Sequence, residues 1–228
     1  MKEKLSRRGS IPFILHPSSL LFTVRIKVCG INNLEDALAA VEAGADMLGF
    51  NFYCESPRYI KPSRARDIIE CLPENVLSVG VFVNERPETV LSIADEAGLG
   101  GLQLHGDETP EDCRAVAGRF LIKALRVGEG FTPESAAAYP SDAVLLDAFD
   151  RGARGGTGRT FDWRLARRTR ELVPQLFLAG GLSPANVEEA IAAVAPYGVD
   201  ACSGLECAPG RKDHALVRDF IARARRAC

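Results

Sequence analysis

A cysteine stands at the end of an apolar run and is followed at once by a glycine, in Val24-Arg25-Ile26-Lys27-Val28-Cys29-Gly30-Ile31. The run is typical of a short β-strand, and strand ends feed the loops in which α/β enzymes build their active sites. A thiol at such a place can take part in chemistry, whereas a cysteine in the middle of a strand usually only packs. We therefore treat Cys29 as a candidate catalytic residue.

A second apolar run, Val144-Leu145-Leu146-Asp147, ends in an aspartate. An acid and a base on different strands can work on opposite sides of a small substrate, so Asp147 is a candidate partner for Cys29. Each residue is ambiguous by itself, because a lone cysteine is more often a buried apolar residue and an aspartate at a strand end often caps a turn. Asp150 competes for the acid role, but it lies farther along the loop.

The elements that must position these side chains alternate regularly from Val24 onward. Short β-branched runs are separated by alanine-rich stretches of helical period, which is typical of parallel βαβ units. We expect eight strands, at residues 25–29, 47–52, 77–83, 101–104, 121–125, 143–147, 175–179 and 199–202. The clearest helices are expected at residues 34–43, 63–71, 87–97, 110–117, 162–170, 184–194 and 214–225, with a weaker one at 131–139. Asn33, Thr109 and Ser183 are the predicted N-caps.

Eight strands with intervening helices predict an α/β protein with a single closed (βα)8 TIM barrel. A doubly wound open sheet would more often carry G-x-G-x-x-G after its first strand, and Cys29-Gly30-Ile31-Asn32-Asn33 lacks it. We see no break in composition within residues 23–228, so we expect one barrel domain there. The short apolar stretch within residues 1–22 is interrupted by Pro12 and Pro17, which argues against a signal peptide. We therefore predict a flexible N-terminal extension there.

Composition excludes several classes of protein. With 28 Lys and Arg against 30 Asp and Glu, the net charge of -2 gives no long-range attraction for nucleic acid or an anionic membrane. No apolar run approaches the length of a membrane span. The seven cysteines include no C-x-x-C pair, which argues against a zinc site or a disulfide framework. We therefore expect a cytoplasmic protein with reduced thiols and no nucleic-acid or membrane partner.

Glycine-containing loops follow the last two expected strands. Gly180 and Gly181 follow the seventh strand, and Ser203 and Gly204 follow the eighth. In a barrel these two loops commonly hold phosphate, because bare glycine amides let backbone N–H groups approach an oxyanion. Paired glycines also make simple tight turns, but two such loops in these positions favour a phosphate site.

Three further features lie at the same end of the expected barrel. Arg58 follows the second strand and could pair with a substrate carboxylate, its alternative being a solvent-facing loop residue. His105 follows the fourth strand, nearly opposite the first, so we expect a supporting role rather than a direct bond to Cys29. The glycine-rich stretch 155–160 lacks the P-loop pattern and is either a flap over a ligand or a solvated loop.

These residues resemble, in order along the chain, the motifs of the phosphoribosylanthranilate isomerase family. The matching segments are Lys27-Val28-Cys29-Gly30-Ile31, Gly44-Ala45-Asp46 through Gly49-Phe50, Ser56-Pro57-Arg58-Tyr59, Val79-Gly80-Val81-Phe82-Val83-Asn84, Leu102-Gln103-Leu104-His105-Gly106, Leu145-Leu146-Asp147, Gly155-Gly156-Thr157-Gly158, Phe161-Asp162-Trp163, Ala179-Gly180-Gly181-Leu182, Asn186-Val187, Ser203-Gly204-Leu205-Glu206 and Pro209-Gly210. Each segment is weak alone, but the ordered set is specific and spans nearly the whole barrel. The family often has Ile at Val28 and Thr at Asn32.

The resemblance implies a barrel of the ribulose-phosphate-binding type and an aldose-ketose isomerase that needs no cofactor. Its reaction is the Amadori rearrangement of N-(5-phosphoribosyl)anthranilate to 1-(2-carboxyphenylamino)-1-deoxyribulose 5-phosphate, the third step from chorismate to tryptophan. Carried over by position, Cys29 is the general base and Asp147 the general acid. Arg58 then holds the anthranilate carboxylate. The implied phosphate ligands are Gly180, Gly181, Ser203 and Gly204.

Two alternatives stay open at this point. A sister phosphosugar barrel that isomerises another aminoaldose would typically use two aspartates, which Cys29 argues against. A non-catalytic phosphosugar-binding barrel would have no need of both Cys29 and Asp147. We expect a phosphorylated small molecule as the partner, and a monomer, with a homodimer as the alternative. The base role also requires surroundings that lower the pKa of the Cys29 thiol.

Overall fold

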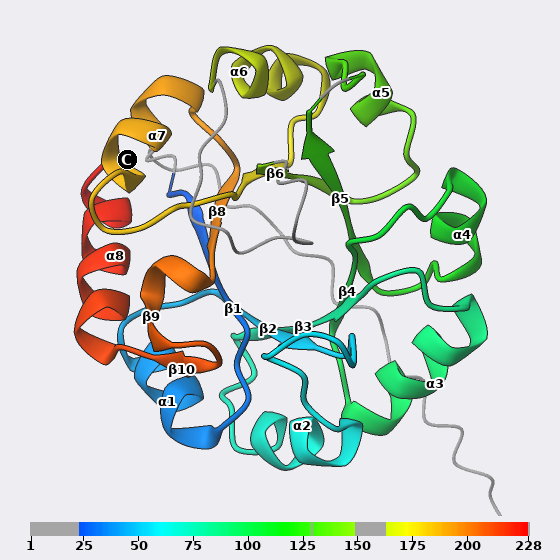
Figure 1. Cartoon of the computed structure of the whole chain (residues 1–228), viewed down its shortest axis with the longest axis vertical. Helices are drawn as coiled ribbons and strands as arrows, with labels where there is room; N and C mark the ends of the chain where they lie inside the picture. Colours follow the sequence, from blue (N-terminus) through cyan, green and yellow to red (C-terminus); the bar gives the residue numbers. More distant parts are fainter. Residues whose placement is uncertain (1–22, 129, 149–162, 228) are drawn as a thin grey trace, which may run out of the picture.

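The computed structural model describes residues 23–128, 130–148 and 163–227. Eight parallel strands form a closed barrel in the order β1 to β8, surrounded by helices (Figure 1). The predicted α/β TIM barrel is therefore confirmed. The proposed flexible extension, residues 1–22, and the glycine-rich stretch 155–160 lie outside the described residues, so both interpretations stay predictions.

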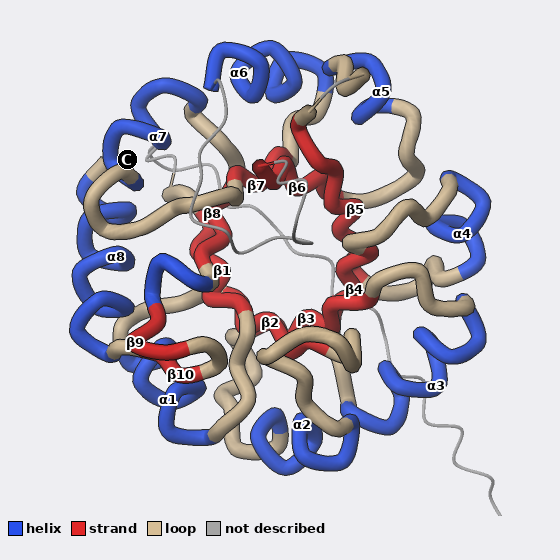
Figure 2. Tube along the Cα trace, viewed as in Figure 1, coloured by secondary structure: helices blue, strands red, loops and turns tan. Residues whose placement is uncertain are grey.

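Strands and helices alternate around the ring (Figure 2). The barrel strands are β1 (Arg25–Cys29), β2 (Met47–Asn51), β3 (Leu77–Phe82), β4 (Gly101–Leu104), β5 (Phe120–Val127), β6 (Ala143–Ala148), β7 (Leu176–Leu178) and β8 (Gly198–Ala201). The helices are α1 (Leu34–Glu42), α2 (Pro62–Ile69), α3 (Pro87–Ala97), α4 (Pro110–Ala115), α5 (Pro133–Ala137), α6 (Trp163–Leu172), α7 (Val187–Val194) and α8 (His214–Arg226). Each predicted strand is present, and β5 is longer than expected because it pairs with β6 as far as Arg126 and Val127.

Two of the three predicted helix caps are confirmed. The side chains of Asn33 and Thr109 accept hydrogen bonds from the backbone N–H three residues later, which satisfies a free donor at the start of α1 and α4. The prediction for Ser183 is wrong, because α7 begins only at Val187. The Asn186 side chain instead accepts from the N–H of Ser183 and closes a turn ahead of the helix.

A small hairpin after β8 was not predicted. A 3₁₀ turn (Ser203–Leu205) is followed by β9 (Glu206–Ala208) and β10 (Arg211–Lys212), which pair antiparallel. Gly210 makes its turn with φ of 78°, a conformation that glycine adopts without strain. The hairpin brings Glu206 and Lys212 close to each other at the end of β8.

The barrel interior holds its own apolar cluster, separate from the larger core between strands and helices. Met47, Val79, Ile122, Leu145 and Phe177 contribute to it from five different strands. Side chains alternate across each strand, so the inward residues form layers along the barrel axis. The barrel interior is therefore filled by side chains. The polar side chains that point inward, such as those of Lys27 and Asp200, lie apart from this apolar cluster.

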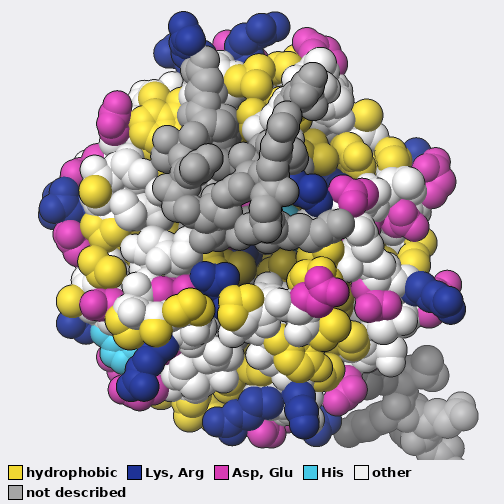
Figure 3. Space-filling view, viewed as in Figure 1, with side chains coloured by type: hydrophobic (Ala, Val, Ile, Leu, Met, Phe, Trp, Pro, Cys, Tyr) yellow, Lys and Arg dark blue, Asp and Glu magenta, His cyan; other side chains and the backbone are white. Residues whose placement is uncertain are grey.

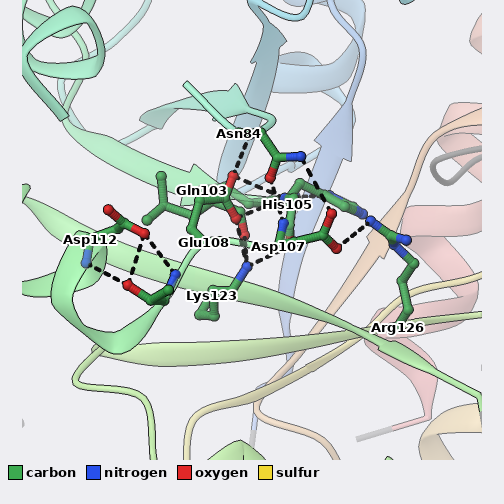
Figure 4. A network of polar contacts seen from close by, with 11 residues as sticks. Asn84, Gln103, His105, Asp107, Glu108, Asp112, Lys123 and Arg126 are labelled. Atoms are coloured by element: carbon green, nitrogen blue, oxygen red, sulfur yellow. Dashed lines mark hydrogen bonds and ion pairs between the residues drawn. The ribbon is translucent and has the colours of Figure 1, made fainter. Parts of the chain in front are cut away.

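One buried ion pair secures the loop that follows β4. The Lys123 Nζ atom lies 2.7 Å from Glu108 Oε2 and 2.9 Å from the carbonyl oxygen of Gly106, and both charged side chains are almost fully buried. Glu108 also accepts from the backbone N–H groups of Asn84 and Gly106, at 2.7 and 2.8 Å (Figure 4). Because Lys123 Nζ also donates to the carbonyl oxygen of Leu104, at 3.3 Å, this network fixes the chain on both sides of His105.

Replacing Lys123 with Met should destabilise the protein, because Glu108 would remain buried without its cation. We expect the free energy of unfolding in urea to fall by about 3 kcal/mol. Arg114→Met is the matched control, since it breaks an ion pair with Glu111 whose side chains are 60% and 77% exposed. It should leave the unfolding midpoint unchanged. Equal midpoints for the two variants would contradict the structural role assigned to Lys123.

Candidate active site

The thiol of Cys29 lies in a crowded part of the barrel interior, at the C-terminal end of β1. Cys29 ends β1 and is 8% exposed. A Cβ atom placed on Gly49 of β2 would lie 2.7 Å from its sulfur and 3.2 Å from Lys27 Nζ. Any side chain at position 49 would displace one of these groups, so the glycine is what allows thiol and ammonium to lie together.

A buried ion pair lies one layer below the thiol. Lys27 Nζ is 2.8 Å from Asp200 Oδ1, and the two residues are directly paired across β1 and β8. Burial opposes the charged form of Lys27, but Asp200 and a hydrogen bond to Cys29 outweigh it and raise the lysine's pKa. Burial raises the pKa of Asp200 to about 6, against the pull of Lys27. Lys27 therefore stays protonated and donates to both neighbours.

A second charged cluster lies on the other side of Cys29. Glu206 accepts from Nε and Nη2 of Arg58 at 2.8 and 2.7 Å, and from Lys212 Nζ at 3.0 Å. Burial alone would raise the pKa of Glu206, but its bonds to Arg58 and Lys212 lower it, so it is a carboxylate. Lys212 also donates to the carbonyl oxygen of Cys202, at 3.1 Å. Glu206 thus holds two cations beside the thiol.

The charges around Cys29 favour a thiolate. A hydrogen bond from Cys202 lowers the pKa of Cys29 most, burial opposes this, and Lys27, Lys212 and His105 lower it further. The net result is a pKa well below that of an ordinary thiol. Three buried or half-buried cations, those of Lys27, Arg58 and Lys212, surround only two carboxylates. The Cys29 anion supplies the missing negative charge.

The aspartate predicted as the acid is buried near the end of β6, three strands from β1 by the shorter way around the ring. His105 Nε2 lies 3.2 Å from Asp147 Oδ2, and His105 Nδ1 lies 2.7 Å from Gln103 Nε2. The amide nitrogen of Gln103 thus faces one ring nitrogen of His105, and the Asp147 carboxyl group faces the other. His105 therefore contacts Asp147, and its supporting role stays a prediction. The competing residue Asp150 lies outside the described residues.

The glycine loops after β7 and β8 lie against each other. Gly180 and Gly181 have φ of 79° and 71°, which favours glycine, and a Cβ on Gly204 would lie 2.1 Å from the carbonyl oxygen of Leu182. Within the described residues, the backbone N–H groups of Gly181, Ser203 and Gly204 donate no hydrogen bond. Adjacent loops with such N–H groups can bind an oxyanion.

The structure brings Arg58 to Cys29 although they are far apart in sequence. A Cβ on Gly30, the residue after Cys29, would lie 2.8 Å from Arg58 Cδ and 3.0 Å from Cys202 Sγ. Sequence reasoning missed the other members of this group. They are Lys27, Asp200, Cys202, Glu206 and Lys212. Lys27 and Asp200 were detectable, because each is a charged residue between two apolar residues near the end of an expected strand.

Charged side chains of both signs are interspersed over the described part of the face in Figure 3, which agrees with the net charge of -2. Among the described helices, none has the length and apolar character that crossing a bilayer requires. The described residues also contain no group of three or more side chains placed to hold a metal ion.

Comparison with known proteins gives a consistent result. A family model for N-(5'-phosphoribosyl)anthranilate (PRA) isomerase matches residues 26–223. The N-(5'-phosphoribosyl)anthranilate isomerase of Geobacter sulfurreducens is 52% identical over 202 residues, covering 89% of this chain and 98% of the relative. That of Trichlorobacter lovleyi is 50% identical over 204 residues, covering 90% and 99%.

Solved structures of phosphoribosyl anthranilate isomerases are also similar to this chain. The phosphoribosyl anthranilate isomerase of Thermotoga maritima has a TM-score of 0.82 and 47% identity, with 88% of this chain and 98% of the other covered. A phosphoribosyl anthranilate isomerase in complex with reduced 1-(o-carboxyphenylamino)-1-deoxyribulose 5-phosphate has a TM-score of 0.80 and 46% identity, with the same coverage.

The surroundings of Cys29 predict opposite effects for the two members of the buried ion pair. In the wild type, the rate of Cys29 alkylation by iodoacetamide should fall only as the pH drops through its lowered pKa. Lys27→Met removes a cation and should move that pH upward by about one unit. Asp200→Asn removes a negative charge and should move it downward. The measurement is the pH dependence of alkylation, followed on the peptide that contains Cys29. Shifts of the same sign would contradict the electrostatic account.

Proposed function

The chain belongs to the N-(5'-phosphoribosyl)anthranilate isomerase family, and we propose that Cys29 and Asp147 carry out its reaction here. That reaction is the Amadori rearrangement of N-(5-phosphoribosyl)anthranilate to 1-(2-carboxyphenylamino)-1-deoxyribulose 5-phosphate, in tryptophan biosynthesis. The observation that carries the assignment is a thiol at a strand end of the barrel beside the buried Lys27 and Lys212 cations, which lower its pKa. A proton abstraction next to an iminium carbon needs such a base.

Asp147 acts first, as the general acid. It protonates the furanose ring oxygen, the bond from that oxygen to C1′ breaks, and the electron pair of the anilino nitrogen forms a protonated Schiff base. The carboxylate left on Asp147 keeps the hydrogen bond from His105 Nε2, which stabilises its new charge. We therefore assign His105 the part of a positioning residue, which holds the Asp147 carboxyl group in place through this contact.

Cys29 acts second, as the general base. Its thiolate removes the C2′ proton, and the electrons of that C–H bond flow towards the iminium nitrogen to give an enolamine. Tautomerisation to the ketone completes the isomerisation. Only protons and an internal electron pair move, so the proposed route requires no cofactor.

Two groups hold the ends of the substrate. Glu206 occupies Nε and Nη2 of Arg58, which fixes the guanidinium plane, and we assign the Nη1 edge to the anthranilate carboxylate. The backbone N–H groups in the loops of Gly180, Gly181, Ser203 and Gly204 are assigned to the phosphate. Support comes from the similar structure that was solved with reduced 1-(o-carboxyphenylamino)-1-deoxyribulose 5-phosphate, which carries both groups.

The experiment follows the loss of phosphoribosylanthranilate fluorescence with the wild type and two variants. Cys29→Ser and Asp147→Asn should each lower kcat by a factor of about 10² or more, which is the usual contribution of a placed acid or base. Their circular dichroism should match that of the wild type, because each change nearly conserves side-chain volume.

Arg58→Lys is the contrasting variant in the same assay. A lysine cannot keep the two-point contact with Glu206 while it binds a carboxylate, so KM should rise more than kcat falls. An inactive wild type would overturn the proposed reaction. Variants at Cys29 and Asp147 that stay near the wild-type rate would overturn only their roles.

We also propose that the protein is a cytoplasmic monomer, with a homodimer as the alternative. The large apolar side chains that the structure describes as exposed, Leu38, Tyr59 and Leu172, lie on three different segments and not on one element. The six cysteines in the described part of the chain are free thiols, as expected of a reducing compartment. Sedimentation equilibrium of the full chain should give a single species of 24.6 kDa. A species of twice that mass would show the dimer.

A further inference from the structure

Two thiols lie side by side in the layer directly above the Lys27–Asp200 pair. The pairing of β1 with β8 aligns Lys27 with Asp200 and Val28 with Ala201. Cys29 and Cys202 each follow by one residue, so they point to the same interior face as the ion pair. The two thiols influence each other's ionisation, and a Cβ atom on Gly30, the residue after Cys29, would lie 3.0 Å from Cys202 Sγ.

This placement suits a covalent bond between the two sulfur atoms. Neighbouring strands lie about 4.8 Å apart, within the range of Cα separations that disulfides span. Cys202 is partly exposed and Cys29 is 8% exposed, so a reagent as small as a peroxide can reach the pair. Among the other described cysteines, Cys113 is fully buried on α4, on the far side of the barrel wall from this layer.

We propose that Cys29 and Cys202 form an oxidation site, at which hydrogen peroxide converts the two thiols into a disulfide and removes the catalytic base. Nothing in the proposed isomerisation requires Cys202 to react covalently. The site therefore adds a second chemistry to the same group of residues, and its formation does not rest on the proposed function.

The first step uses the charge state of the pair. The Cys29 thiolate attacks one oxygen of the peroxide, an S–O bond forms, the O–O bond breaks, and the departing hydroxide takes a proton to become water. Cys29 is now a sulfenic acid. Lys27 and Lys212, which favour the thiolate, also stabilise the hydroxide as it leaves.

The second step consumes the neighbouring thiol. The Cys29 thiolate beside it raises the pKa of Cys202 most and burial raises it further, so Cys202 is protonated at the start. Once Cys29 has lost its charge, Cys202 gives up its proton and its sulfur attacks Cys29. An S–S bond forms, the S–O bond breaks, and the hydroxyl leaves with that proton as water. In total, two thiols are oxidised by two electrons and one peroxide becomes two waters.

The test exposes the full chain to hydrogen peroxide with dimedone present, then blocks free thiols, digests the protein and identifies peptides by mass. The wild type should give a Cys29–Cys202 linked peptide pair that disappears with dithiothreitol. The isomerase rate should be lost and then return in parallel. In Cys202→Ser the link cannot form, so dimedone labelling of Cys29 should rise about tenfold, as expected for a trapped sulfenic acid.

Cys71→Ser is the matched control, because Cys71 is exposed and lies away from the pair at the end of α2. It should form the link as readily as the wild type. Absence of the linked pair in the wild type, or equal dimedone labelling in wild type and Cys202→Ser, would overturn the proposal. The mass measurement needs no isomerase activity, so a failure of the proposed function would appear separately, as an inactive untreated protein.

Discussion

The buried ammonium of Lys27 is the interaction on which the chemistry of this site depends. An isolated charge inside a barrel would be very costly, so it has to be paired, and Asp200 on the neighbouring strand pairs with it at 2.8 Å. Burial weakens that partner by raising the pKa of Asp200 to about 6. The positive charge of Lys27 is therefore only partly neutralised by Asp200. It also attracts the Cys29 thiolate, to which Lys27 donates a hydrogen bond. The reactive anion is part of how the interior charges are balanced.

The second charged cluster, on the other side of Cys29, also contains a cation whose charge is not fully neutralised. Glu206 joins Arg58 and Lys212, so its single negative charge leaves one of the two cations uncompensated. Arg58 is held at two points by that carboxylate and keeps a fixed orientation. Arg58, proposed to bind a substrate carboxylate, and Lys212, which lowers the pKa of Cys29, are thus coupled through Glu206.

The same features that make a good base also make a vulnerable one. A low thiol pKa favours proton abstraction at neutral pH and equally favours attack on a peroxide. Cys202 contributes to both, because its hydrogen bond stabilises the Cys29 anion and its sulfur lies where a disulfide would form. A serine in its place would keep a hydrogen-bond donor without offering a second sulfur.

Local sequence patterns determined the barrel, its eight strands and the strand-end positions of Cys29 and Asp147. Alternating strands and helices can bury their apolar faces against one another in only a few architectures. The resemblance to a known family added roles for those residues. Tertiary structure alone decided the surroundings of Cys29. Cys202 and Asp200 lie more than 170 positions from it in the sequence, and only the closure of the barrel, which pairs β8 with β1, makes them neighbours. A pKa depends on charges within a few ångströms, and linear order does not specify such distances.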